Sequence, residues 1–204
     1  NETNGFGGGI FAQGDFYGYI DVTLLDSTVS GNSARRGGGV AAYEYATVTA
    51  VGSTVSGNQA KARGGGFLFK RADGAITSST IAGNTATSGA GFRIADYTGL
   101  SLVDTTVSGN ESRLEGGALF ARYSDVRIER SRLENNSPSR GGAIYFGLTY
   151  LDLQILSSTI SGNRATEAGG GAFLLSDVGE VRFILTNSTV FFFNDTATTE
   201  IYTS

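Results

Sequence analysis

A six-residue phrase, Ser-Thr-Val-Ser-Gly-Asn, recurs along this chain at a nearly constant spacing. Exact or loosened copies begin at Ser27, Ser53, Ser79, Thr105, Ser131, Ser158 and Ser188, so successive starts lie 26, 26, 26, 26, 27 and 30 residues apart. A fixed period of this length is typical of a solenoid, in which each unit buries its apolar face only by stacking on the next unit. The spacing therefore predicts one continuous repeat body.

Each repeat contains short runs with the alternating, β-branched pattern of strands and no helical run. In residues 47–72, the runs 47–52, 53–57 and 64–69 are predicted to be strands, and the polar run 59–63 is predicted to be a turn and short loop. Three strands in each repeat predict an all-β fold, a three-sided parallel β-helix (solenoid) of about seven coils of about 26 residues. A right-handed coil is expected because parallel crossovers are nearly always right-handed.

Apolar residues recur at fixed positions of the repeat and predict the core. The third position of the phrase holds Val29, Val55, Ile81, Val107, Leu133, Ile160 and Val190. The strand after the glycines supplies the pairs Val40 and Ala42, Phe67 and Phe69, Phe92 and Ile94, Leu119 and Ala121, Ile144 and Phe146, and Ala172 and Leu174. At about 4.8 Å per coil, these residues should stack into a continuous apolar interior.

An asparagine ends the phrase in six coils, at Asn32, Asn58, Asn84, Asn110, Asn136 and Asn163. Asparagine tolerates the left-handed backbone of a turn, and its amide can bond the amide of the next coil. We expect a structural ladder at these positions, and a ligand site is the alternative. The glycine runs that follow are expected to allow sharp turns and close approach between coils.

Composition excludes several classes of function. The chain has no Cys and no His, which removes disulfides, thiolate or imidazole metal sites and a Ser-His-Asp triad. The net charge is −4 and the basic residues are scattered in the sequence, so no nucleic-acid partner is expected. No run approaches the roughly 18 apolar residues of a membrane-spanning helix. No metal or cofactor is predicted from these residue types, apart from calcium, which carboxylate oxygens could bind.

The repeat divides the chain into residues 1–190 and a non-repeat tail, 191–204. Asn1 stands six residues before Gly7, as Asn58 stands before Gly64, so we expect the chain to begin within a coil of a longer protein. The run Phe-Phe-Phe at 191–193 replaces the expected Ser-Gly-Asn. Residues 191–203 resemble translated sequencing-adapter read-through, and an aromatic cap on the rod is the alternative.

An outward-facing column is expected between the two core columns of the glycine strand. It reads Phe11, Ala41, Leu68, Arg93, Phe120, Tyr145 and Phe173. An apolar stripe of this kind can mark a binding groove, so Phe120, Tyr145 and Phe173 are the predicted ligand-binding residues, as a platform for sugar rings. The alternative is that loops or neighbouring side chains cover the stripe.

The loop after the glycine strand carries an acid in most coils, at Asp15, Glu44, Asp73, Asp96, Asp125 and Asp177. Paired carboxylates roughly 5 to 10 Å apart are what glycoside hydrolysis needs, and calcium could use the same oxygens. The candidate catalytic residues are Glu44, Asp73 and Asp96, with Lys70 and Arg93 as nearby bases. The alternative is turn chemistry, because Asp is a favoured turn residue. Arg36, Arg63 and Arg140, which precede the glycines, are expected to be solvated loop residues.

The phrase together with Gly-Gly-Gly and Arg140-Gly-Gly-Ala-Ile-Tyr145 resembles bacterial right-handed parallel β-helix repeat proteins of the polymorphic outer-membrane-protein and autotransporter-passenger type. The resemblance covers residues 1–190. It implies an extracellular or cell-surface location, an adhesive or structural role, and a polysaccharide or a host or neighbour-cell surface as partner. Related β-helices include polysaccharide lyases and glycosidases, but no catalytic motif of those enzymes is recognisable here.

The resulting hypothesis is a non-catalytic stalk or adhesin with glycan contact. A polysaccharide lyase or glycoside hydrolase with a groove along the glycine strand is the alternative. Ice binding is a minor alternative, because the second and fourth positions of the phrase form rows of small hydroxyls such as Thr54 and Ser56, interrupted by Arg132 and Glu134.

Overall fold

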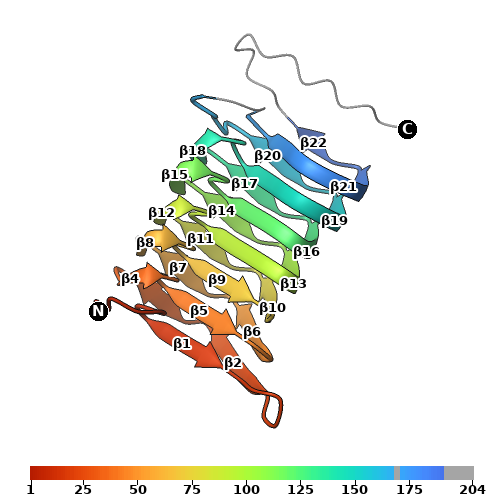
Figure 1. Ribbon diagram of the computed structural model, residues 1–204. Helices are drawn as coiled ribbons and strands as arrows, with labels where there is room; N and C mark the ends of the chain where they lie inside the picture. Colours follow the sequence, from red (N-terminus) through yellow and green to blue (C-terminus); the bar gives the residue numbers. More distant parts are fainter. Residues whose placement is uncertain (168–170, 191–204) are drawn as a thin grey trace.

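The computed structural model describes residues 1–167 and 171–190, which form a parallel β-helix with three sheets along its length (Figure 1). Every pairing between two of its strands is parallel. The predicted fold class is therefore confirmed. The predicted tail, 191–204, lies outside the described residues.

In the described part of the chain, the three sheets contain ten, seven and five strands. The first sheet consists of β1 (Ile10–Gln13), β2 (Ile20–Leu25), β5 (Val40–Tyr43), β6 (Ala46–Val51), β9 (Phe67–Lys70), β10 (Asp73–Thr77), β13 (Phe92–Val103), β16 (Leu119–Glu129), β19 (Ile144–Leu156) and β21 (Phe173–Thr186). The second sheet consists of β3 (Thr28–Ser30), β7 (Thr54–Ser56), β11 (Thr80–Ala82), β14 (Thr106–Ser108), β17 (Arg132–Glu134), β20 (Thr159–Ser161) and β22 (Thr189–Val190). The third sheet consists of β4 (Ser33–Arg36), β8 (Gln59–Arg63), β12 (Thr85–Ser88), β15 (Glu111–Glu115) and β18 (Ser137–Arg140). The seven strands of the second sheet span about six complete turns of the helix.

The polar run 59–63 is a strand, β8, and the prediction of a loop there was wrong. Ala60 is buried while Gln59 and Lys61 are exposed, so the run alternates as a strand does. Parallel neighbours β4 and β12 supply its main-chain partners, which a polar sequence alone does not reveal. The sheet that contains β8 is the third side of the helix. The runs 47–52 and 64–69, which were assigned to separate sides, correspond to β6 and β9 and both belong to the first sheet.

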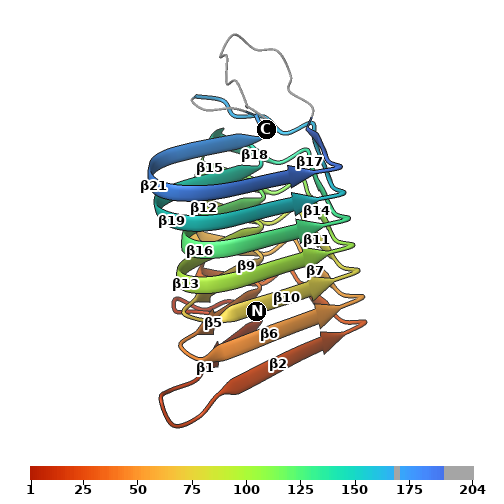
Figure 2. The same cartoon turned by 90° about the vertical axis from the view of Figure 1, so that its right-hand side faces the viewer.

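The first sheet bends within each coil (Figure 2). In the early coils the bend separates β5 from β6 and β9 from β10, whereas β13, β16, β19 and β21 run through it as continuous strands. The backbone at this bend takes positive φ at non-glycine residues, among them Tyr45 (56°), Arg71 (51°), Tyr97 (64°) and Tyr123 (50°). The bend therefore places one or two strained residues of each of these coils at the outer edge of the sheet, since Glu44 and Asp96 also have positive φ.

The interior is a stacked apolar column. Phe67, Phe69 and Phe92 have no exposed surface, and the Phe67 ring stacks on Phe69 and Phe92 with centroid distances of 5.6 and 5.1 Å. The core residues predicted from the third phrase position are buried from Val29 to Ile160. Like residues meet across coils because the pairing register follows the 26-residue period.

The register of the last coil differs from the sequence prediction. Phe173 pairs with Ile144, so it occupies the inward column, and the predicted inward positions of Ala172 and Leu174 are each one residue too early. Phe173 is 8% exposed and packs edge-on against Phe183, with centroids 5.6 Å apart. The spacing from Ile144 to Phe173 exceeds the usual repeat, and a shift of one residue turns a strand side chain to the opposite face. Phe173 is therefore a core residue, and its assignment to an outward sugar platform is corrected.

The phrase asparagines form a buried hydrogen-bonded ladder. The carboxamide oxygen of Asn84 accepts bonds from the main-chain N–H and the Nδ2 of Asn58, both 3.0 Å long. The Asn84 Nδ2 donates in turn to Asn110 Oδ1 and to the carbonyl of Val55, each at 3.0 Å. Equivalent bonds join Asn32 to Asn58, Asn110 to Asn136, and Asn136 to Asn163. Because the side-chain groups find partners without water, the turn can be buried at little cost.

A second ladder runs through the first hydroxyl of the phrase. The main-chain N–H of Ser53 donates to Ser79 Oγ at 3.0 Å, and the Ser53 hydroxyl donates to the carbonyl of Val51 at 2.9 Å. The same arrangement recurs from Ser27 to Ser188. The two ladders therefore bracket each strand of the second sheet and hold it in one register.

We expect Asn84→Ala to lower the free energy of unfolding by about 3 kcal/mol, because it leaves buried donors of Asn58 and a buried acceptor of Val55 without partners. Denaturant unfolding followed by circular dichroism measures the loss. Ser108→Ala, at a partly exposed position of the second sheet, is the control and should change the value by less than about 0.5 kcal/mol. Equal effects of the two substitutions would contradict a stabilising ladder.

Candidate functional site

A glycine corner brings the end of the third sheet over the outer face of the first sheet. Gly64 has φ of +66°, and a Cβ there would lie 2.5 Å from the Phe67 carbonyl oxygen and 2.8 Å from Leu68 Cβ. Only glycine fits this backbone and this space. The residue before the corner glycine, Arg63 in this coil, is therefore held beside the outward column of the glycine strand. Arg36, Arg63 and Arg140 end β4, β8 and β18, so the prediction that they lie in loops was wrong, although Arg63 is exposed to solvent as expected.

The middle of the outward column is covered by its neighbours, whereas Phe11 at its start is 47% exposed. Leu68, Arg93 and Phe120 are all buried. Phe120 is sandwiched, with the Arg93 guanidinium carbon 3.6 Å from its ring centroid on one side and the Tyr145 ring stacked at 4.9 Å on the other. Neighbour packing therefore accounts for this stripe. The structure brings Phe120 and Tyr145 together but leaves Phe120 only 8% exposed, which is too little for a sugar platform.

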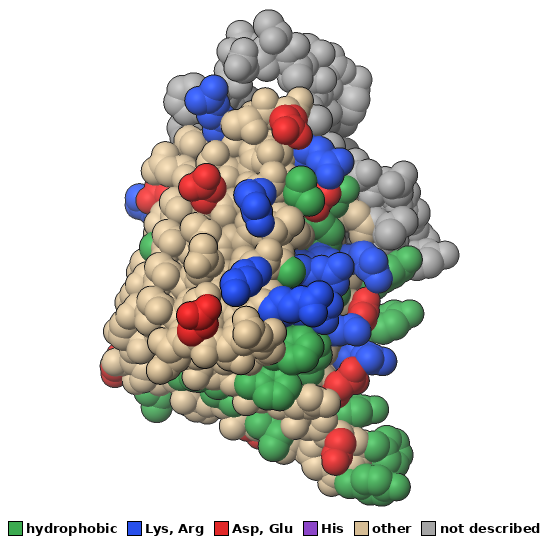
Figure 3. Space-filling model, turned by 60° about the vertical axis from the view of Figure 1, so that its left-hand side comes forward, with side chains coloured by type: hydrophobic (Ala, Val, Ile, Leu, Met, Phe, Trp, Pro, Cys, Tyr) green, Lys and Arg blue, Asp and Glu red, His purple; other side chains and the backbone are tan. Residues whose placement is uncertain are grey.

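A basic hollow lies beside this column. It has a volume of about 140 Å³ and is lined by Arg36, Tyr43, Arg63, Leu68, Lys70, Arg93, Ala95, Asp96 and Arg122. We call it the arginine hollow. Figure 3 shows Lys and Arg side chains gathered on this face, beside hydrophobic side chains that project from its edge. Five cations and one acid line the hollow, although the whole chain has a net charge of −4.

Short side chains at two positions create the hollow. Ala95 is paired with Lys70 in one neighbouring coil and Arg122 in the other, so a methyl group stands between two long cations. At the corner, Ser88 likewise lies between Arg63 and Glu115. Because both small residues lie in the coil of Arg93, a space remains beside Arg93, between the longer side chains of the coils on either side.

Arg93 is the buried cation of the arginine hollow. The residue is 6% exposed, and its Nε and Nη1 have no hydrogen-bond partner among the described residues. Burial, followed by the charges of Arg63 and Arg122, lowers the pKa of Arg93 to about 9. The Nε groups of Arg36 and Arg122 are also buried without a partner in the described chain. Three arginines of one hollow thus present unsatisfied donors, which is costly without a ligand.

The structure brings three of the five candidate catalytic residues together in the arginine hollow: Lys70, Arg93 and Asp96. Asp96 forms ion pairs with Lys70 at 3.5 Å and with Arg122 at 3.6 Å. The sequence analysis missed Arg122 and Tyr43 because they lie in other coils and share no motif with Arg93. Burial raises the pKa of Tyr43, so the phenol is held in its neutral form.

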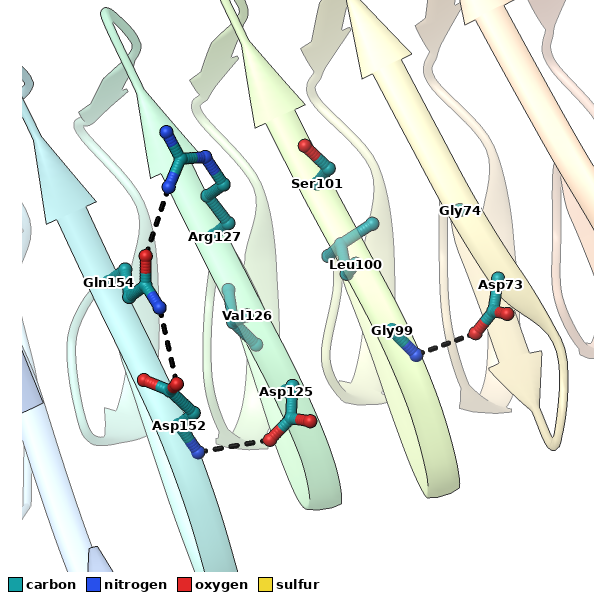
Figure 4. A pocket seen from close by; sticks show the side chains of 10 residues that line it. All are labelled: Asp73, Gly74, Gly99, Leu100, Ser101, Asp125, Val126, Arg127, Asp152 and Gln154. Carbon is teal, nitrogen blue, oxygen red and sulfur yellow. Dashed lines mark hydrogen bonds between the residues drawn. The ribbon is translucent and has the colours of Figure 1, made fainter. Parts of the chain in front are cut away.

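The other two candidates lie elsewhere. Glu44 is ion-paired with Arg71 at the bend of the first sheet. Asp73 lines a separate, shallow hollow of about 440 Å³ together with Asp125, Asp152, Arg127 and Gln154 (Figure 4). We call it the aspartate hollow.

Two carboxylates of the aspartate hollow bond the main chain of the next coil. Asp73 accepts from the Gly99 N–H at 2.7 Å, and Asp125 accepts from the Asp152 N–H at 3.0 Å. These bonds are the turn chemistry that the sequence left open as an alternative. One coil separates Asp125 from Asp152 and two separate Asp73 from Asp125, which is roughly 5 and 10 Å at the usual strand spacing. Those separations still permit carboxylate-pair chemistry.

Calcium has no evident ligand set. In residues 1–167 and 171–190, no group of three or more acidic side chains is placed to hold a metal ion. Calcium takes six to eight oxygen ligands, so calcium binding stays a prediction that the described geometry does not favour.

An exposed aromatic column lies at the bend of the first sheet. Tyr19, Tyr45, Tyr97 and Tyr123 occupy one position of successive coils, with Arg71 in the remaining coil, and their exposures run from 36% at Tyr123 to 86% at Tyr97. We call this column the tyrosine ridge. Arg71, which interrupts the row of tyrosines, is ion-paired with Glu44 of the neighbouring coil. The sequence analysis missed the ridge, although the recurrence of Tyr every 26 or 52 residues was the signal that could have revealed it.

The second sheet presents its hydroxyls outward as expected. Thr54, Thr80 and Thr106 stack in register, and Arg132 follows at the same position and interrupts the row. Ice binding at this face stays a minor alternative.

The chain belongs to the right-handed β-helix family, because the family model described as right handed beta helix region matches residues 8–190. This fold supports a structural or carbohydrate-related role in general. Neither the curated proteins nor the solved structures compared with the chain give a match. The described part of the chain contains no helix with the length and apolarity that a membrane crossing requires.

We expect Tyr97→Asn to raise the free energy of unfolding by about 0.5 kcal/mol, because asparagine adopts positive φ more readily than tyrosine and the exposed ring buries little surface. Denaturant unfolding measures the change. A clear loss of stability would show that Tyr97 serves the fold, and would remove the reason to assign it another role.

Proposed function

We propose that this chain is a non-catalytic segment of a bacterial secreted or cell-surface β-helix protein, a stalk or adhesin that contacts glycans through the tyrosine ridge. The family supports a structural or carbohydrate-related role, and the two buried ladders suit a stiff extended body. The partner is a polysaccharide, either in solution or on the surface of a host or neighbouring cell.

The observation that carries the proposal is the exposure of ridge tyrosines in a strained backbone. Tyr97 is 86% exposed at a φ of +64°, and Tyr45 and Tyr123 also have positive φ. Glycine or asparagine would suit such positions better, so stability does not account for tyrosine in four of the five coils from Tyr19 to Tyr123. A tyrosine offers a flat apolar face with a polar hydroxyl, which suits the apolar face and polar rim of a sugar ring.

The spacing of the ridge supports a polymeric ligand. Neighbouring rungs of a parallel sheet lie about 4.8 Å apart, so the side chains form a regular row along the helix axis. The Glu44–Arg71 pair, which interrupts the row of tyrosines, adds hydrogen-bond donors and acceptors for hydroxyl groups. A chain of sugars lying along the row would meet several rings at once.

We expect the double variant Tyr97→Ala/Tyr123→Ala to bind its polysaccharide at least tenfold more weakly than the parent chain. Affinity electrophoresis through gels containing neutral or acidic polysaccharides measures the retention. The matched control is Phe16→Ala/Tyr17→Ala, which removes two exposed rings from the loop before β2, outside the ridge. Equal retention of parent and ridge variant in every gel that retards the parent would overturn the ridge as the glycan contact.

A polysaccharide lyase or glycoside hydrolase is the second candidate. It is favoured by the convergence of Asp96 with Lys70 and Arg122 beside the arginine hollow, and by the spacing of Asp125 and Asp152 in the aspartate hollow. Against it, Asp96 is paired with two cations and Asp125 with a main-chain N–H. Asp152 Oδ2 is bonded to Gln154, although its Oδ1 has no partner among the described residues. Such partners suit a structural role for these carboxylates.

We expect no sustained product release when the protein is incubated with a panel of acidic and neutral polysaccharides, with and without calcium. Reducing-end assays detect hydrolysis, and ultraviolet absorbance detects the double bond that a lyase leaves in its product. Turnover that is lost in Asp96→Asn, Asp73→Asn or Asp125→Asn would replace the non-catalytic proposal with the enzyme. Glu134→Gln, on the outer face of the second sheet, is the control.

A further inference from the structure

We propose that the arginine hollow binds an oxoanion, the carboxylate or sulfate group of an acidic sugar. This inference rests on the proposed glycan contact for its sugar, whereas the oxoanion site itself rests on the geometry of the hollow alone. With an oxoanion in the hollow, the expected ligand is an acidic polysaccharide and not a neutral one.

The first argument is charge. Arg36, Arg63, Lys70, Arg93 and Arg122 line the hollow, and Asp96 is the one acid on its wall. An excess of four positive charges in a small hollow is unfavourable in a chain whose total charge is negative, unless an anion offsets it. Glu115, in the next coil, also acts on Arg93, but it is itself paired with Arg140 at 2.6 Å and offsets only part of this charge.

The second argument is hydrogen bonding. Arg93 is more than nine-tenths buried, yet two of its three guanidinium nitrogens have no partner within the described residues. Its ring neighbour Phe120 holds the guanidinium flat at 3.6 Å, so the donor edge is fixed in place. A planar guanidinium matches the paired oxygens of a carboxylate or sulfate. An oxoanion in the hollow would accept the bonds that Arg93, Arg36 and Arg122 leave unmade.

The third argument is size. The hollow holds about 140 Å³, several times the 10–15 Å³ that one buried water requires. That volume suits one small anionic group and excludes a whole sugar chain, which would have to lie outside. The tyrosine ridge is close enough for this arrangement, because Asp96 and Arg122 line the hollow and are followed directly by Tyr97 and Tyr123 of the ridge. An acidic sugar can thus place its charge in the hollow while its polymer follows the ridge.

The test uses sulfate as the first probe. We expect sodium sulfate to raise the thermal midpoint of the parent chain in a saturable way, compared with sodium chloride at equal ionic strength. The variant Arg63→Gln/Lys70→Gln should bind sulfate at least tenfold more weakly, a difference of about 1.4 kcal/mol. The control Lys61→Gln/Arg113→Gln removes the same charge from exposed positions of the third sheet and should respond like the parent. Because sulfate stabilises proteins generally, an equal shift in all three proteins would overturn the site.

Arg93→Met separates binding from structure. Methionine keeps an apolar side chain on Phe120 but removes the unpartnered donors. We expect this variant to lose the sulfate shift and to keep or exceed the parent's midpoint in chloride, because buried unsatisfied groups destabilise the unliganded fold. A variant that folds but melts well below the parent would mean that Arg93 serves packing, which overturns its role as the oxoanion donor.

The last arm identifies the sugar. Titration with glucuronate and with glucose, followed by calorimetry, compares an acidic sugar with its neutral counterpart. The proposal is supported if the parent chain binds glucuronate but not glucose, and if Arg63→Gln/Lys70→Gln abolishes the binding of glucuronate. If sulfate binds but neither glucuronate nor a sulfated saccharide binds, the hollow takes only inorganic anions, and the acidic-sugar assignment is overturned. If the ridge variant Tyr97→Ala/Tyr123→Ala retains full polysaccharide binding while the hollow binds sulfate, the glycan contact at the ridge is overturned and the oxoanion site still holds.

Discussion

The structure depends on the hydrogen bonds that side chains make between successive coils. Asn58, Asn84 and Asn110 bond both the amide and the main chain of their neighbours inside the protein, where no water competes. The serine and threonine hydroxyls do the same at the start of the phrase. These bonds can form only when equivalent residues lie directly above one another, so they fix the register of every coil. All other columns, apolar, aromatic or charged, follow from that register.

The fixed register converts sequence spacing into surface chemistry. Because Tyr97 and Tyr123 are 26 residues apart, their rings must lie on adjacent rungs at the bend. The glycine corner adds a second effect, since it folds Arg63 beside the face that carries Arg93. Departures from the consensus then shape the surface. Ala95 and Ser88 open a space that longer side chains at those positions in other coils would fill. Binding features therefore arise where the repeat varies, on a frame that does not vary.

Sequence reasoning worked best where one position recurs in one environment. The β-branched residues at Val55 and Ile81 identified the core because each occupies the inward side of a strand in every coil. Sequence reasoning worked less well where the turns between strands decide which side a residue faces or which strand it joins. The run 59–63 was assigned to a loop although neighbouring strands supply its partners, and Phe173 was placed outward because one extra residue shifts the last register. Phe120 was a predicted sugar contact with cover by neighbouring side chains as the alternative, and the Arg93 side chain covers it.

The sequence by itself determined the coil length, the parallel stacking, the apolar interior and the asparagine positions, because each depends on residues related by a fixed period. Only the tertiary structure decided which outward residues share a surface. The corner and the bend bring Arg36, Lys70, Arg93 and Arg122 from four coils into one hollow, where two Arg93 nitrogens have no hydrogen-bond partner among the described residues. That outcome depends on the angles between sheets and on the reach of each side chain across several coils, which are properties of the folded stack.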